Sequence, residues 1–203
     1  FASTLIISRP RRDFQFTQTS VLIIAEKDDC GVSLSSLLDH LSRLSLKPEV
    51  SDLAHANPAG RVCIVLSDLK GSVFGQVDSE VLEKLKQIFL QSTGVLWVTR
   101  GGMFDVTSPD AGLAVGFART ARSESGVSPI VTLDLGGQNP ASGECAAEII
   151  TGLFRYRFLE GNSSDNDVEY AEKDGILQIP RVVESTQLNQ AIATLQDHQA
   201  LSE

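Results

Sequence analysis

The chain has 203 residues, of which 42% are hydrophobic and 21% are charged, the composition of one globular domain that needs no disulfide or metal to hold its core. Its 17 lysine and arginine residues against 26 aspartate and glutamate residues leave a formal net charge of −9. This balance argues against a nucleic-acid partner, because a duplex-binding surface needs a basic face that releases phosphate counterions.

Apolar strand-like runs alternate with amphipathic helical patterns as far as Phe154. Val21–Ala25 is a short β-branched run of the kind that is buried on both faces, and Leu34–Leu44 carries leucines at helical spacing with Ser33 as the expected N-cap. In chain order, the pattern predicts strands over 21–25, 49–53, 61–67, 95–99 and 130–135, and helices over 34–44, 81–89, 111–121 and 144–154. This alternation predicts an α/β fold with a doubly wound parallel sheet covered by helices on both faces.

The segments on either side of this core differ from it in composition. The chain begins at Phe1 and holds a single methionine, Met103, so we expect a segment of a longer protein. Near the other end, Asp174-Gly175 lies between two short apolar runs and suits a tight hairpin turn. The expected organisation is a linker over 1–18, a domain over 19–160, a mobile loop over 161–167, a hairpin returning to the domain over 168–183, and a linker over 184–203.

The turn after the first strand lacks the glycines of a dinucleotide-binding site. Such a site uses three glycines, so that backbone amides approach the pyrophosphate at the N-terminus of the next helix. Here the turn holds one glycine, Gly31, together with the carboxylates of Asp28 and Asp29, which repel a phosphate at close range. We therefore predict no cofactor-binding residues in this segment.

Catalytic signatures of reductases and hydrolases are also missing. A short-chain reductase needs a lysine four residues after its catalytic tyrosine, to lower the pKa of the phenol. In this chain Tyr156 is followed at that spacing by Glu160, and Tyr170 by Asp174, and a carboxylate shifts a phenol pKa in the wrong direction. Neither a Gly-x-Ser-x-Gly elbow nor a phosphate-binding Gly-x-x-x-x-Gly-Lys loop occurs.

The cysteines and the hydropathy exclude further classes. Cys30, Cys63 and Cys145 are widely spaced and odd in number, so we expect neither a closed disulfide set nor a Cys-x-x-Cys metal pair. No apolar stretch approaches 18 residues, and no signal-peptide pattern leads the chain. We therefore expect a cytoplasmic segment with no metal site and no membrane contact.

One set of acidic residues resembles the receiver domains of two-component signalling. Asp28 and Asp29 follow the first strand, Asp68 ends the third, and Thr99 ends the fourth. In receiver domains the acidic pair binds magnesium beside a phospho-accepting aspartate, which would be Asp68. A lysine is expected after the fifth strand, but glycines stand there. A receiver-like signalling domain is therefore kept only as an alternative.

Four stretches in the second half of the chain resemble a single enzyme family. They are Val95–Gly102 (VLWVTRGG), Gly116–Glu124 (GFARTARSE), Val131–Leu135 (VTLDL) and Glu169–Arg181 (EYAEKDGILQIPR). The first three resemble the structural, or pseudo-ketoreductase, subdomain of fungal-type highly reducing type I polyketide synthases. The fourth resembles the segment that leads into the enoylreductase of those enzymes.

This resemblance implies a truncated Rossmann-like, short-chain-reductase-like fold without cofactor or catalytic residues. It implies a non-catalytic scaffold that braces the ketoreductase of the same polypeptide and positions the enoylreductase. The parent protein is then expected to be a homodimeric, multifunctional polyketide synthase that uses NADPH, phosphopantetheine and S-adenosylmethionine, none of them bound by this segment. A degenerate NADPH-dependent reductase that needs its partner domain is a further alternative.

The residues that carry the family pattern are expected to be structural, with no catalytic, cofactor-binding or metal-binding residue among them. Gly116 and Ala118 are expected to permit close packing of their helix against the sheet, and Arg119, Arg122 and Glu124 to make ion pairs or to cap neighbouring loops. The full set is Trp97, Thr99, Arg100, Gly101, Gly116, Arg119, Arg122, Glu124, Asp134, Asp174, Gly175, Pro180 and Arg181.

Overall fold

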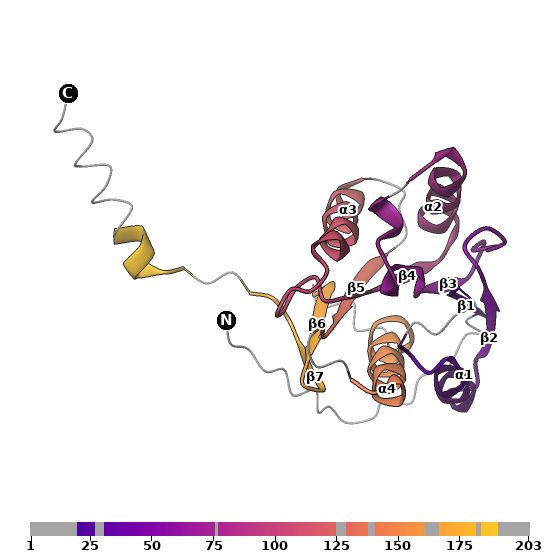
Figure 1. Ribbon diagram of the computed structural model, residues 1–203. Helices are drawn as coiled ribbons and strands as arrows, with labels where there is room; N and C mark the ends of the chain where they lie inside the picture. The colour runs from indigo at the N-terminus through magenta and orange to yellow at the C-terminus, as the bar shows by residue number, and fades with distance from the viewer. Residues whose placement is uncertain are drawn as a thin grey trace.

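The computed structural model of the chain contains one seven-stranded sheet with helices on both of its faces (Figure 1). The structure describes residues 20–26, 31–75, 77–124, 129–137, 141–160, 167–181 and 184–190. The strands are β1 (Ser20–Ile24), β2 (Lys47–Ser51), β3 (Val62–Val65), β4 (Gly94–Arg100), β5 (Ile130–Leu135), β6 (Glu169–Lys173) and β7 (Ile176–Gln178). Their order across the sheet is β2-β1-β3-β4-β5-β6-β7, and every neighbouring pair is parallel except β6 and β7.

Four α-helices cover the sheet in two pairs. They are α1 (Leu34–Arg43), α2 (Ser79–Gln91), α3 (Gly112–Ser123) and α4 (Gly143–Phe154), the last continued by a π-helical turn, η4 (Arg155–Leu159). Helices α1 and α4 lie on one face and α2 and α3 on the other (Figure 1), each pair over its own apolar cluster. Among the described helices, none is long and apolar enough to cross a bilayer.

Side chains that cap helix N-termini explain where three of the helices begin. Ser33 accepts a hydrogen bond from the amide of Ser36, Asp78 from that of Val81, and Ser142 from that of Cys145. Each oxygen satisfies one of the amides that a first turn leaves unpaired. The predicted cap at Ser33 is confirmed.

The predicted fold class is confirmed, with small differences at the ends of elements. The second strand begins at Lys47, two residues earlier than predicted, and includes Pro48. A proline is tolerated there because β2 is an edge strand with one unpaired side. The predicted linker over 1–18, residues 191–203 of the predicted linker over 184–203, and residues 161–166 of the predicted loop lie outside the described residues.

The predicted hairpin is confirmed and joins the main sheet. Strands β6 and β7 pair antiparallel across Asp174 and Gly175, whose φ angles are 53° and 77°. Positive φ at both central residues is the signature of a type I′ turn, which explains the Asp-Gly sequence. Because β6 also pairs parallel with β5, the hairpin extends the sheet by two strands.

A buried hydroxyl in β5 provides a test of the packing. Thr132 is 1% exposed, and no described residue offers its Oγ1 a hydrogen-bond partner. Replacing it with valine is therefore expected to raise the free energy of unfolding by about 1 kcal/mol. Urea unfolding of the purified chain measures the change.

The matched control is Thr151, which is also buried but donates from Oγ1 to the carbonyl of Ala147 at 2.8 Å. Thr151→Val removes a satisfied hydrogen bond and is not expected to stabilise the chain. Equal effects of the two substitutions would show that the Thr132 hydroxyl is not unpaired in solution.

Candidate functional site

The carboxyl ends of the parallel strands form the candidate site of this fold. In open α/β sheets, ligands bind beyond those ends, where the strand order reverses. The reversal here lies between β1 and β3, because β2 flanks β1 on the other side. The residues that surround this point follow β1, β3, β4 and β5.

Arg100 contacts Gly31, which lies shortly before α1. Its Nη2 donates to the carbonyl of Gly31 at 3.1 Å, although the two residues are 69 positions apart. Gly31 has a φ of +71°, and a methyl group added to it would lie 3.2 Å from the same Nη2. The single glycine of the turn is therefore in contact with a guanidinium that belongs to β4, and it stays exposed.

The N-terminus of α1 is bonded to the start of α4. The amide of Ser33 donates to the carbonyl of Gly143 at 2.9 Å, while the amide of Ser36 donates to the hydroxyl of Ser33. A methyl group on Gly143 would lie 3.0 Å from the Ser33 nitrogen, so the two helix starts are in close contact. In dinucleotide-binding folds the amides at the start of this helix bind phosphate. Here the amides of Ser33 and Ser36 donate hydrogen bonds within the chain instead.

Asp134 organises the carboxyl ends of β4 and β5. This side chain is 2% exposed, and it accepts hydrogen bonds from the hydroxyl of Thr99 at 2.7 Å, the amide of Gly102 at 3.0 Å and the amide of Met103 at 2.9 Å. A buried carboxylate is stable when its oxygens are satisfied in this way. Asp134 thereby fixes the first residues of the loop that leaves β4.

Two glycines let that loop fold back across the strand ends. A methyl group on Gly101, whose φ is +70°, would lie 2.2 Å from Thr107 Oγ1, and one on Gly137 would lie 2.3 Å from the same oxygen. The amides of Thr107 and Ser108 both donate to the carbonyl of Gly101 at 3.0 Å. The loop from β4 therefore closes tightly over the exit of β5.

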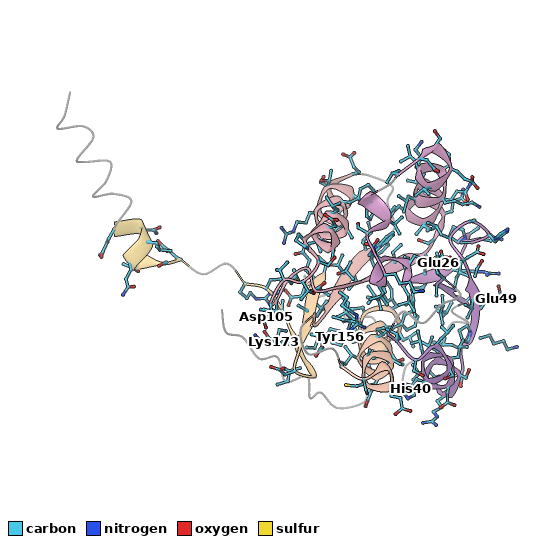
Figure 2. All side chains as sticks on the ribbon, viewed as in Figure 1. Glu26, His40, Glu49, Asp105, Tyr156 and Lys173 are labelled. Carbon is cyan, nitrogen blue, oxygen red and sulfur yellow. The ribbon has the colours of Figure 1, made fainter. Side chains whose placement is uncertain are left out.

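Glu172 ties the hairpin to the same edge, a role that the sequence analysis missed. Its buried carboxylate accepts from the amide of Gly136 at 2.8 Å and from the amide of Gly175 at 2.7 Å. Beside it, Lys173 forms an ion pair with Asp105 at 3.0 Å (Figure 2). The available signal was a glutamate directly before the Lys-Asp-Gly turn, next to the apolar pair Tyr170 and Ala171.

A cluster of charged side chains lies at the amino ends of β5 and β6, at the edge of the sheet opposite the candidate site. Glu169 receives two hydrogen bonds from Arg119, at 2.9 and 2.7 Å, and one from Arg122 at 2.8 Å. Arg122 also donates to the carbonyls of Ile130 and Val168. The predicted ion pairs of Arg119 and Arg122 are thus observed, and they join α3 to β5 and β6 at the edge opposite the candidate site.

This cluster predicts a dependence of stability on pH. The hydrogen bond from Arg119, followed by that from Arg122, holds the pKa of Glu169 below its ordinary value. A carboxyl whose pKa is lower in the folded state stabilises the fold above its unfolded pKa, about 4.3, and this contribution is lost as the pH falls through the folded pKa. Glu169→Gln is therefore expected to destabilise the chain at pH 7 and to do so progressively less below about pH 4.

Glu83 offers a control, because it pairs with Lys86 on an exposed helix face. Glu83→Gln is expected to change the free energy of unfolding by less than about 0.5 kcal/mol at either pH. Urea unfolding at pH 7 and pH 4 compares the two variants. An equal effect of Glu169→Gln at both pH values would contradict a lowered pKa for Glu169.

Asp68 does not lie where a phospho-accepting aspartate would have to lie, because it is not accessible to solvent. It is buried, and its carboxylate accepts hydrogen bonds from the indole of Trp97 at 3.0 Å and from the amide of Val73. Burial raises the pKa of Asp68, against the effect of those two bonds. The receiver-like alternative does not fit this geometry, and its acidic pair, Asp28 and Asp29, lies outside the described residues.

Two other side chains with reactive groups, Tyr170 and Cys63, are buried in the core. Tyr170 is buried in β6, where its hydroxyl donates to the carbonyl of Asp167. Burial raises the pKa of the Cys63 thiol to about 12, so it stays protonated at neutral pH. No group of three or more metal-ligating side chains occurs in the part of the chain that the structure describes.

The remaining family-pattern residues are spread over the surface. Gly116 is exposed on α3, so the prediction that it packs against the sheet is wrong, whereas Ala118 is buried there. Glu124 ends that helix, and Pro180 is exposed after β7. Arg181 pairs with Asp167, at 2.7 Å between Nη2 and Oδ2. The thirteen predicted residues therefore do not form a single site.

Comparisons with known proteins agree with this fold. Residues 31–183 match the family described as "HRPKS sdrA-like, NAD(P)-binding Rossmann-fold domain". The chain is 38% identical over 193 residues to highly reducing polyketide synthase phiA of Fungal sp., which covers 94% of this chain and 7% of that protein. It is 35% identical over 196 residues to highly reducing polyketide synthase tstA of Talaromyces stipitatus; this alignment covers 95% of this chain and 8% of that protein. The chain thus spans less than a tenth of the length of these relatives, and no solved structure matches it.

Proposed function

Because this chain belongs to the NAD(P)-binding Rossmann-fold domains of sdrA-like highly reducing polyketide synthases, we propose that it is a non-catalytic structural domain of such an enzyme. In this role it braces the ketoreductase of the same polypeptide and positions the enoylreductase during processing of the β-carbon. The chain itself binds no cofactor, whereas the parent enzyme uses NADPH, phosphopantetheine and S-adenosylmethionine in its other domains.

The observation that carries the proposal is the set of contacts made by Gly31 and Ser33, the residues before α1 that bond to β4 and α4. A dinucleotide pyrophosphate needs glycines with open space above them and amides at the helix start that point to the ligand. The guanidinium of Arg100 lies against Gly31, and the amide of Ser33 is bonded to Gly143. The described residues therefore do not fit the cofactor that the family description names.

The internal use of the family-pattern side chains supports the same role. Thr99 and Asp134 bond to one another and to the loop after β4. Arg119 and Arg122 bond to Glu169 at the amino ends of the strands, away from the edge where ligands bind in such sheets. These contacts join α3, β4, β5 and β6 to one another, as a supporting role requires.

The experiment uses the full-length synthase with the substitutions Arg119→Ala and Arg122→Ala. We expect Arg122→Ala to lower the yield of folded enzyme and the ketoreductase kcat together, with the KM for NADPH unchanged. The reason is that a supporting domain affects the folded structure of the ketoreductase and does not contact NADPH. Arg119 is largely exposed, so Arg119→Ala is expected to have the smaller effect.

A different pattern favours the second candidate, a degenerate NADPH-dependent reductase, which the words "NAD(P)-binding" in the family description keep open. If the KM for NADPH rises severalfold in either variant while the amount of folded enzyme stays constant, these residues serve a cofactor site. That result would overturn the structural role.

A further inference from the structure

The segment that leaves the sheet after β7 is bonded to the segment that enters β6. Arg181 lies three residues after the end of β7, and its Nη1 and Nη2 donate to the two carboxylate oxygens of Asp167, the second at 2.7 Å. Asp167 lies two residues before β6 begins, and its side chain is 15% exposed. These two residues, called the exit pair below, therefore join the entry and the exit of the hairpin at its open end.

Pro180 explains why side chains make this connection. Ala171 faces Gln178 in the antiparallel ladder, and the same register, extended by three residues on each side, leads to Val168 and Arg181. A proline has no amide to donate to such a ladder, and β7 ends two residues before Pro180. The bidentate ion pair therefore continues the connection between the two segments beyond the last backbone pair.

One member of the exit pair is anchored to the core of the domain. The hydroxyl of the buried Tyr170 donates to the carbonyl of Asp167 at 3.1 Å. The next carbonyl, that of Val168, accepts from Arg122 of α3 at 3.1 Å and from the amide of Thr132 of β5 at 2.9 Å. Because the backbone around Asp167 is held by three elements, the Asp167 carboxylate is a fixed point to which Arg181 is bonded.

Other contacts already hold the hairpin on the sheet. Strand β6 pairs with β5, and the buried carboxylate of Glu172 accepts from the amide of Gly136. After β7, Ile179 is 8% exposed and belongs to the apolar core, whereas Pro180 and Arg181 are exposed. The exit pair therefore acts on the chain just beyond the last buried residue of the described part.

The exit pair also lies at the boundary of the family domain. The matched region ends at residue 183, two residues after Arg181, and the chain continues to Glu203. Pro180 and Arg181 close the stretch that resembles the segment leading into the enoylreductase. A proline with a fixed φ angle and a side chain bonded to the core restrict the directions that the following residues can take.

We propose that the exit pair sets the direction in which the polypeptide leaves this domain toward the enoylreductase. This inference rests on the proposed structural role and names the residues that carry its positioning part. Asp167 and Arg181 are positioning residues, since they act through the chain that follows them. The orientation of linked domains sets the effective concentration of a carrier-bound substrate at the enoylreductase, whereas a free substrate reaches that site by diffusion in any orientation.

The full-length synthase with the substitution Arg181→Ala tests the proposal. The same enoyl chain is supplied either on the phosphopantetheine of the carrier domain or as a free pantetheine thioester, and NADPH consumption reports its reduction. We expect the single-turnover rate of the carrier-bound chain to fall at least about fivefold, with the kcat/KM of the free thioester unchanged. Arg155→Ala is the matched control, because Arg155 pairs with Glu160 and is 56% exposed, against 49% for Arg181; it is expected to change neither rate.

Asp167→Asn tests the other side of the pair, because it removes the charge and nearly keeps the shape of the side chain. It is expected to slow the carrier-bound chain and to leave the free thioester unaffected. If neither variant slows the carrier-bound chain, or if only one of them does, the proposal is overturned. An equal fall for both substrates also overturns it, because that is the result of a disturbed fold.

Hydrogen exchange in the same enzymes provides a readout of the chain itself. In Arg181→Ala the amides of residues 179–181 are expected to exchange severalfold faster, while those of β5 keep their protection. Unchanged exchange at residues 179–181 overturns the exit pair. The proposed role is judged separately by NADPH binding to the purified chain. Unchanged rates in a chain that binds no NADPH reject the exit pair alone, whereas micromolar binding rejects the non-catalytic role.

Discussion

Replacing Asp134 with alanine is expected to lower the free energy of unfolding by about 3–5 kcal/mol, because it leaves one buried and two half-buried donors without an acceptor. The donors are the hydroxyl of Thr99 and the amides of Gly102 and Met103. Water cannot readily replace the carboxylate, since Thr99 is fully buried. Urea unfolding of the purified chain, followed by circular dichroism, measures the loss.

Asp39→Ala is the matched control, because Asp39 pairs with Arg43 on an exposed helix face. Its effect is expected to stay below about 1 kcal/mol. Asp134→Asn keeps the shape of the side chain and one acceptor oxygen, so it should fall between the two alanine variants. If Asp134→Ala were as mild as Asp39→Ala, the carboxyl ends of β4 and β5 would not be held by this carboxylate.

The second large effect is expected for Gly101→Ala, at about 3–5 kcal/mol of destabilisation from backbone strain and steric overlap combined. Gly101 has a φ of +70°, and an added methyl group would lie 2.2 Å from Thr107 Oγ1 and 3.3 Å from the Cα of Gly137. The backbone of Thr107 is held beside Gly101, because its amide is bonded to the carbonyl of Gly101.

Gly60 separates the two causes. Its φ is +69°, nearly that of Gly101, but an added methyl group would meet nothing within 4 Å. Gly60→Ala therefore measures the backbone strain alone, which is expected to amount to about 1–2 kcal/mol. Equal losses for the two variants, again from urea unfolding, would mean that the loop after β4 does not pack against β5 as described.

The α/β architecture could be predicted because its signals are local. The β-branched run at β1, the leucine spacing of α1 and the Ser33 cap each depend on residues within a few positions of one another. The Asp-Gly turn of the hairpin was also predictable, since it needs positive φ at two adjacent residues.

The contacts that define the strand ends could not be predicted in the same way. Arg100 meets Gly31 across 69 positions, and Arg119 meets Glu169 across 50. Sequence reasoning identified Arg100, Arg119 and Asp134 through a family resemblance, but the partners depend on strand order, which local patterns do not fix. Glu172 was missed because a glutamate in a strand usually faces solvent, whereas this one is buried between two backbone amides.

The two clusters explain how a Rossmann-type domain can serve as a support. At the carboxyl edge, Asp134 and Glu172 hold the loops that leave β4 and β5. At the amino edge, Glu169 joins α3 to the sheet through Arg119 and Arg122.

The central claim is that this chain has no cofactor site of its own, and NADPH titration of the purified chain tests it most directly. Cooperative urea unfolding first establishes that the sample is folded, and an NADPH-dependent reductase in the same buffer serves as the positive control. We predict no saturable change in NADPH fluorescence or binding heat up to about 1 mM. A saturable dissociation constant in the micromolar range would contradict the structural role and assign this domain to the reductases.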